Sequence, residues 1–234
     1  GTYTNGDYVV NCHDGVAHGE LDIYGILGMS CNGAFDTIAQ TLNSTKWQKL
    51  AEDFGYNQSD RSQVDFPYKK SHFDIASDDS VWSRMQLAIG QGTTTVTPLL
   101  NLMIYAAIAN DGVMMTPYLV DHYLDADGNV VEQTKPKALR SVCTKAEAEL
   151  MDEFLTYVIT NGTAAAGGSQ YARVSGKTGS AQYDSTKNYH AWFCGYGTND
   201  VSEIAVCVMI EKGGAGGIVA APVAGQIFDY YFSR

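Results

Sequence analysis

The sequence predicts an α+β fold in which helices flank both faces of an antiparallel sheet. Apolar residues recur at helical spacing through much of the first 160 residues. Three strand-like segments then follow one another, at 171–178, 191–196 and 203–210, and an amphipathic segment at 221–232 closes the chain. In the third strand, apolar residues occupy both alternating sets of positions, which is typical of a strand covered by helices on both sides.

The first part of the chain combines loops with two predicted helices. Residues 1–29 are rich in glycine, and we expect loops and short turns there. Apolar residues at helical spacing after Asn32 predict the first helix. A second helix is predicted over 45–54, where Thr45 opens a capping box. The polar stretch 56–80 is predicted to be irregular.

Two further helices and a hairpin are predicted in the middle of the chain. The most apolar helix covers 98–109, and because its apolar residues occupy almost the whole surface we expect it to be buried on most sides. Segments 118–124 and 130–133 flank a turn of Asp, Asn and Gly residues and predict a hairpin. A Thr-x-x-Glu capping box begins a helix over 145–161. The glycine-rich run 213–217 is predicted to be a flexible turn.

Length and charge exclude several classes of protein. The 234 residues suit one large domain or two small ones. The net charge of −11 argues against nucleic acid as a partner. The longest apolar stretches, 102–109 and 204–210, are much shorter than the roughly 18–20 residues that span a bilayer. The chain begins without Met and reads like the interior of a protein, so we expect a fragment.

The cysteines and histidines predict neither a disulfide scaffold nor a metal site. The five cysteines include no Cys-x-x-Cys pair. Cys12, His13 and His18 lie close together in the sequence but lack the second ligand pair of a tetrahedral site. Cys31 has no paired base beside it and is expected to be a packed thiol. We therefore expect no metal and no other cofactor.

Two short motifs carry the candidate chemistry. Ser30-Cys31-Asn32 stands just before a predicted helix, and Lys177-Thr178-Gly179 ends a predicted strand. Each is weak alone, because Ser and Asn favour helix caps and a Lys-Thr-Gly triplet arises by chance in about one chain in twenty of this length. Their order adds weight, because Ser-x-Asn and Lys-Thr-Gly occur together with Ser-x-x-Lys in penicillin-binding proteins and β-lactamases.

The chain resembles the transpeptidase domain of penicillin-binding proteins, most closely the class B type. The resemblance covers nearly the whole chain, so residues 1–234 are identified as the C-terminal portion of one such domain. It implies the α+β fold that this family shares with serine β-lactamases. Besides the two motifs, it rests on His18-Gly19-Glu20-Leu21-Asp22, Ala88-Ile89-Gly90-Gln91-Gly92, Thr97-Pro98-Leu99, Ala191-Trp192-Phe193 and Ala221-Pro222-Val223-Ala224.

The resemblance implies a role for each motif residue. Ser30 would relay a proton to the leaving amine, and Asn32 would hold the substrate's peptide amide. Lys177 would be a cation that depresses the pKa of a second, catalytic lysine. The residues that would bind the carboxylate end of a peptidoglycan stem peptide or of a β-lactam are Thr178, Gly179 and Ser180.

One element of the family pattern is missing. None of the serines in this chain is followed three positions later by Lys, so the Ser-x-x-Lys nucleophile is absent. We expect it upstream, in a missing N-terminal part of the same domain, and we expect this chain alone to be inactive; natural loss of the nucleophile is the alternative. Its helix would cover the sheet face opposite the closing helix, and we expect that face to be open here.

The resemblance implies that the intact protein is a bacterial peptidoglycan D,D-transpeptidase that works through an acyl-serine intermediate and binds penicillin. It would face the outside of the cell membrane, held by an upstream anchor. A non-catalytic penicillin-binding sensor or scaffold is the alternative.

Cys194 and Cys207 are also expected to face one another on paired strands.

Overall fold

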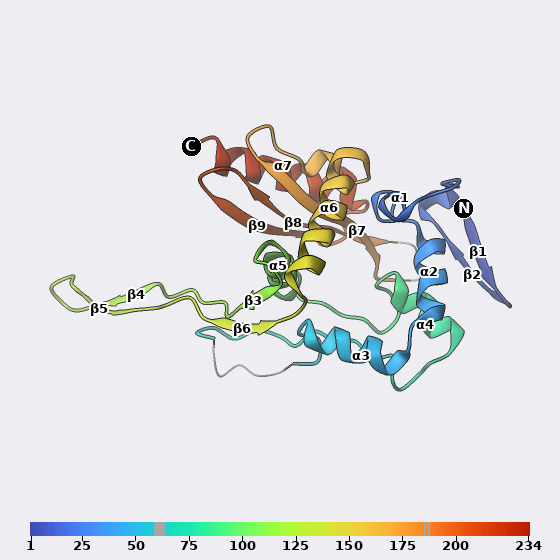
Figure 1. Cartoon of the computed structure of the whole chain (residues 1–234), viewed down its shortest axis with the longest axis horizontal. Coiled ribbons are helices and arrows are strands. Elements are labelled where there is room, and N and C mark those ends of the chain that lie inside the picture. The colour runs from blue at the N-terminus through green and yellow to red at the C-terminus, as the bar shows by residue number, and fades with distance from the viewer. Residues whose placement is uncertain (59–63, 185, 187) are drawn as a thin grey trace.

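The computed structural model describes residues 1–58, 64–184, 186 and 188–234, whose course is drawn in Figure 1. The α-helices are α1 (Ile23–Gly28), α2 (Asn32–Thr41), α3 (Ser44–Asp53), α4 (Val81–Ala88), α5 (Pro98–Ala109), α6 (Lys145–Asn161) and α7 (Gly216–Phe232). Short 3-10 helices cover His13–Gly15 and Ala165–Gly167. The strands are β1 (Thr2–Asn5), β2 (Tyr8–Asn11), β3 (Val113–Met115), β4 (His122–Leu124), β5 (Val130–Gln133), β6 (Ala138–Ser141), β7 (Arg173–Gln182), β8 (Tyr189–Thr198) and β9 (Glu203–Ile210).

The central sheet is antiparallel, in the order β7-β8-β9, which confirms the predicted succession of three strands. Its register pairs Gly197 with Ile204 and Cys194 with Cys207, as expected. The two sulfur atoms lie 3.1 Å apart, and both cysteines are free thiols. The pairs β1-β2, β3-β6 and β4-β5 form three separate two-stranded sheets.

Helices cover both faces of the central sheet, as the composition of its third strand predicts. On one face α7 packs over β8 and β9, where Phe193 and Phe228 are fully buried at the centre of the core. Their rings meet edge to face, with centroids 6.3 Å apart. On the opposite face lies α5, which contacts β8 and β9 (Figure 1). The α+β fold class is confirmed.

The position of α5 corrects one expectation and confirms another. The sheet face opposite the closing helix is not left open, because α5 from this chain covers part of it. Helix α5 is covered on most sides, as expected: Leu100 and Ala107 are buried, and the other residues after Pro98 are partly buried. The helix contacts the sheet, β3 and α6.

The N-terminal region is more ordered than predicted. Residues 1–29 contain the β1-β2 hairpin and α1, not only loops. The strands are four residues each and the helix six, too short to give a periodic signal. Asp22 caps α1 by accepting a hydrogen bond from the Gly25 N–H at 2.8 Å. Figure 1 shows this blue region beside the end of β7.

Several predicted element boundaries also change. The second predicted helix, α3, begins at Ser44, and its cap is Asn43, which accepts from the Lys46 N–H at 3.0 Å; the capping box at Thr45 is therefore wrong. Helix α4 was not predicted; its cap is Ser80. The short pair β3-β6 was not predicted either.

Other predicted elements are confirmed. These are the helices α2, α5 and α6, the capping box of α6 and the β4-β5 hairpin. The described part of 56–80 is irregular apart from a bridge between His72 and Thr95, and residues 59–63 lie outside the described part. Among the described residues, no helix is long and apolar enough to cross a membrane.

Helix α7 begins five residues earlier than predicted, so the run 213–217 is not wholly a flexible turn. Gly216 starts the helix, and a Cβ on it would lie 2.3 Å from the Gly179 carbonyl oxygen and 2.5 Å from that of Trp192. Glycine thus allows the end of the helix to approach the sheet closely. This contact places the first turn of α7 beside the Lys-Thr-Gly segment of β7.

Candidate active site

The two sequence motifs meet at the end of α1. Helix α1 packs against α6, and α6 packs along β7. Gly162, just after α6, lies so close to Gly28 that a Cβ on it would be 2.4 Å from the Gly28 carbonyl oxygen, and the Thr163 N–H donates to that oxygen at 3.0 Å. The residues after α1 therefore lie beside β7. There Lys177 Nζ donates to Ser30 Oγ at 3.0 Å, across 147 residues of sequence.

Ser30 has an uncommon backbone conformation. Its φ is +53°, in the left-handed region, and its N–H donates to the Leu27 carbonyl at 3.1 Å. This conformation costs a non-glycine residue about 1–2 kcal/mol. Such strain persists where the surrounding structure imposes it, often at functional sites. Here it accompanies a hydroxyl group that is held against Lys177.

Lys177 lies near the middle of β7 and is half-buried. Besides Ser30, its ammonium donates to the carbonyl oxygen of Thr178 at 3.0 Å. Burial disfavours the charged form and lowers the pKa of Lys177 to about 8. The neutral amine is therefore about 300 times more populated at pH 7 than for an unperturbed lysine. Lys177 can both hold the Ser30 hydroxyl and exchange protons near neutral pH.

Part of the Asn32 side chain is already used within the protein. It begins α2, and its side-chain amide donates to the Asn11 carbonyl at 2.8 Å, at the end of β2. This bond fixes the N-terminus of α2 to the β1-β2 hairpin. The structure thus brings Ser30 and Lys177 into contact. One N–H of the Asn32 amide is used within the protein, and its second N–H and its oxygen can meet a ligand.

Thr178, Gly179 and Ser180 follow Lys177 along β7. The hydroxyl groups of Thr178 and Thr163 lie 3.2 Å apart, and Ser180 Oγ accepts from the Gly216 N–H at 3.1 Å. The Ser180 hydroxyl still has its own proton to donate. Because the N-terminus of a helix carries partial positive charge, the start of α7 makes this segment favourable for an anion such as a carboxylate.

Two other residues near β7 are assigned by their contacts. With its amide oriented to satisfy both atoms, Gln91 accepts from the Gln182 N–H at 3.3 Å and donates to the Gln182 carbonyl at 3.2 Å. It therefore ties the loop after α4 to the open edge of β7; only the family resemblance had marked this loop. His190 accepts from the Lys212 N–H at 3.1 Å and stacks on Tyr183, so its contacts are structural.

Comparison with known proteins confirms the family resemblance. Residues 1–229 match the family described as the penicillin binding protein transpeptidase domain. The peptidoglycan D,D-transpeptidase PbpA of Mycolicibacterium smegmatis is 29% identical over 203 residues, which are 83% of this chain and 40% of that protein. The peptidoglycan D,D-transpeptidase MrdA of Acinetobacter baumannii is 28% identical over 237 residues, 92% of this chain and 35% of that protein.

Solved structures show the same likeness. The D,D-transpeptidase domain of a peptidoglycan glycosyltransferase from Eggerthella lenta superposes with a TM-score of 0.87 at 27% identity, over 97% of this chain and 57% of that one. Penicillin-binding protein 3 of Mycobacterium tuberculosis, complexed with aztreonam, gives 0.83 at 26% identity, over 100% of this chain and 56% of that one. This chain spans less than two thirds of each of these proteins. Its matched residues, fold and motifs show that it belongs to the family of penicillin-binding protein transpeptidase domains.

Proposed function

We propose that the intact protein carrying this chain is a peptidoglycan D,D-transpeptidase. The chain supplies two motifs of its active site, Ser-x-Asn and Lys-Thr-Gly. The observation that carries the proposal is the contact of Lys177 Nζ with Ser30 Oγ at 3.0 Å, which joins the two motifs. The named transpeptidases among its relatives support the reaction class. An enzyme of this class acts on the stem peptides of bacterial peptidoglycan, which we therefore propose as the substrate.

The reaction needs a nucleophile that this chain lacks. A serine of a Ser-x-x-Lys motif, in the N-terminal part of the domain, attacks the carbonyl carbon between the two D-alanines of a stem peptide. The bond to the terminal D-alanine breaks, that residue leaves as an amine, and an acyl-serine remains. The amine of a neighbouring stem peptide then takes the acyl group, which restores the serine and forms the cross-link.

Ser30 and Lys177 act in the proton transfers of these steps. Because Ser30 Oγ accepts from Lys177, its own proton is directed away from that lysine and toward the leaving amine. Lys177, with a pKa of about 8, can replace the proton that Ser30 gives up. Its positive charge also lowers the pKa of the missing motif lysine, which favours that lysine as the base.

The substrate lies along the open edge of β7. An extended peptide can pair with an edge strand through backbone hydrogen bonds. Its terminal carboxylate meets Thr178 and Ser180 beside the N-terminus of α7, and the Ser180 N–H is one donor to the developing oxyanion. The oxygen of the Asn32 amide receives the peptide N–H. Absence of a side chain at Gly179 keeps the strand accessible to the substrate.

β-Lactams bind the same site and acylate the same serine. Structures of penicillin-binding protein A from Mycobacterium tuberculosis as imipenem and penicillin G acyl-enzymes share this fold. We further propose that the intact protein works on the outer face of the cell membrane, held by an anchor outside this chain. The chain alone is then inactive, because it needs the N-terminal part of its domain.

The test is cross-linking by the intact protein. A pentapeptide ending in D-Ala-D-Ala is incubated with an amine acceptor, and the cross-linked product and released D-alanine are measured by mass spectrometry. Ser30→Ala and Lys177→Ala should each lower the rate about 100-fold or more. Ser169→Ala and Lys145→Ala, which change a hydroxyl and an exposed amine elsewhere, serve as controls.

Absence of cross-linking by the wild-type protein, with no acyl-enzyme on β-lactam treatment, would overturn the proposed reaction. Acylation by a β-lactam without any cross-linking would instead favour the sensor or scaffold.

A further inference from the structure

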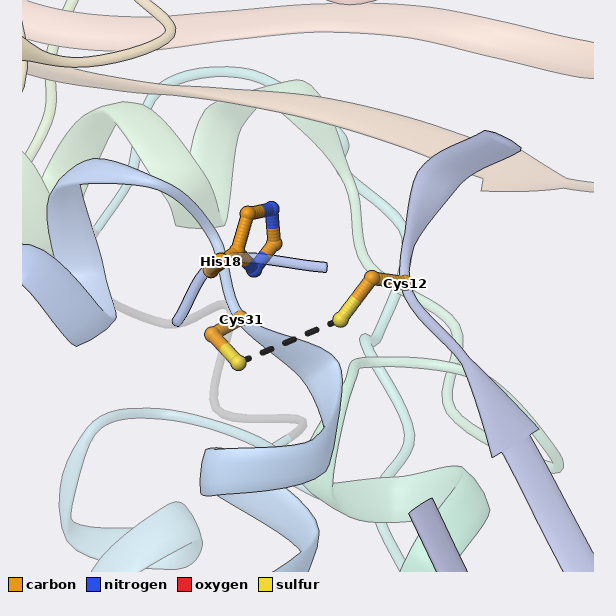
Figure 2. Close-up of side chains that lie close together, drawn as sticks. All are labelled: Cys12, His18 and Cys31. Carbon is orange, nitrogen blue, oxygen red and sulfur yellow. Dashed lines mark hydrogen bonds between the residues drawn. The ribbon is translucent and has the colours of Figure 1, made fainter. Parts of the chain in front are cut away.

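Three side chains with metal-binding groups converge beside the Ser-x-Asn motif. Cys12 lies just after β2, His18 lies between the first 3-10 helix and α1, and Cys31 immediately precedes α2. Their ligand atoms all lie within 4.8 Å of one another. Figure 2 shows the two sulfur atoms and the imidazole ring gathered around one space. None of the three takes part in the contact between Ser30 and Lys177.

The separation of the two sulfur atoms fits a shared metal ion. Cys12 Sγ and Cys31 Sγ are 3.9 Å apart. Two thiolates at about 2.3 Å from a tetrahedral zinc ion lie about 3.8 Å from one another. A disulfide requires about 2.05 Å. The backbone therefore already holds the sulfur atoms at the spacing that zinc ligands adopt.

The imidazole supplies a second, independent observation. His18 Nδ1 is inaccessible to solvent and, among the described residues, has no hydrogen-bond partner. A buried polar nitrogen without a partner costs about 1–3 kcal/mol. Coordination of a metal would satisfy it. Cys12 is also buried, with 5% of its surface exposed, so an ion at this point would be largely shielded from solvent.

We propose that Cys12, His18 and Cys31 bind one Zn²⁺ ion, with a water molecule or another oxygen donor in the fourth position. Thiolate and imidazole ligands select zinc over magnesium and calcium, which prefer oxygen. On binding, each cysteine releases its proton, so two positive charges leave as two enter. The resulting centre is electrically neutral, which makes its burial favourable.

The zinc centre would hold the Ser-x-Asn motif in place without touching the substrate. Cys31 stands between Ser30 and Asn32 in the chain, and Asn32 already bonds to Asn11, the neighbour of Cys12. An ion shared by Cys12 and Cys31 adds a second link between the hairpin and α2. It would thereby stabilise the left-handed conformation of Ser30. From the sequence we expected no metal, because Cys12, His13 and His18 were considered as one group and Cys31 was considered separately, as a packed thiol.

The proposal is tested on the intact protein, purified under reducing conditions, equilibrated with zinc and then desalted. Elemental mass spectrometry should find about one zinc per chain. Cys12→Ser, His18→Asn and Cys31→Ser should each lower this to less than about 0.1. Cys143→Ser and His122→Asn, which remove a thiol and an imidazole elsewhere, should leave it unchanged. Wild-type protein with less than about 0.1 zinc, or ligand variants that keep the metal, would overturn the proposal.

A second measurement avoids variants that fail to fold. The wild-type protein is alkylated briefly with iodoacetamide, with and without a zinc chelator, and the labelled peptides are mapped. The chelator should speed labelling of Cys12 and Cys31 at least about 10-fold and leave Cys143 unchanged. Equal labelling in both samples contradicts the proposal. So does a disulfide between Cys12 and Cys31 that persists in reducing buffer with no metal present.

Discussion

Replacing Lys177 with methionine removes an ammonium group that the fold keeps half-buried against Ser30. Burial lowers the pKa of Lys177 from 10.5 to about 8, so between these values the unfolded chain binds more protons than the folded one. Below pH 8, Lys177 is charged in both the folded and the unfolded protein, so the folded protein bears the full free-energy cost of burying that charge. This cost is relieved as pH rises toward 10.5, so in this range the wild-type protein gains stability with pH.

The two pKa values set the size of the effect. Between pH 7 and pH 9.5, proton linkage at Lys177 raises the free energy of unfolding by about 2 kcal/mol. Solvent screening at a partly exposed side chain reduces this figure, and we expect about 1–2 kcal/mol. The methionine variant lacks this gain. All other titrating groups are shared, so the difference between the two proteins isolates Lys177.

The assay is urea unfolding of wild type and Lys177→Met at pH 7 and pH 9.5, followed by tryptophan fluorescence. The control is Lys145→Met, because Lys145 is exposed and its contact with Asp111 raises its pKa; it should keep the full wild-type pH dependence in this range. If Lys177→Met gains as much stability with pH as wild type does, the burial of the Lys177 charge is refuted.

Three further outcomes follow from the structure. Gly216→Ala should lower the free energy of unfolding by about 1–3 kcal/mol, because a Cβ would lie 2.3 Å from the Gly179 oxygen; unchanged urea stability would contradict this contact. Phe193→Ala should cost about 3–5 kcal/mol, since Phe193 is fully buried, and a loss below about 1 kcal/mol in the same assay would place it outside the core. The 234-residue chain alone should take up no fluorescent penicillin, because it has no Ser-x-x-Lys; an adduct mapped by mass spectrometry to Ser30 or any other residue would show this wrong.

The sequence predicted best where local signals were strong. The three strands β7, β8 and β9 and the pairing of Cys194 with Cys207 followed from alternation and loop length. Helix α6 was marked by its capping box. By contrast, β2 and α4 are short and support one another through tertiary contacts, such as the stacking of Tyr8 on Trp82 with ring centroids 5.7 Å apart. Such contacts leave no periodic pattern in either segment.

The candidate site, too, was only partly predictable from the sequence. The family resemblance was enough to assign Ser30 and Lys177 to one site, but the left-handed backbone of Ser30 and the lowered pKa of Lys177 depend on segments distant in sequence. The bond of Asn32 to Asn11 could not be predicted because residues 1–29 were expected to be loops. For the same reason, the approach of Cys12 to Cys31 was not foreseen.

The central claim is that Ser30 and Lys177 act as one unit in the site of the intact protein. The direct measurement is the acylation rate by a fluorescent penicillin for Ser30→Ala, Lys177→Ala and the double variant. Residues that act together are strongly non-additive. We predict that each single variant slows acylation about 100-fold or more and that the double variant is no more than about threefold slower than the slower single one. Single variants that acylate at the wild-type rate, or a double variant slowed by the product of the two single effects, would contradict the claim.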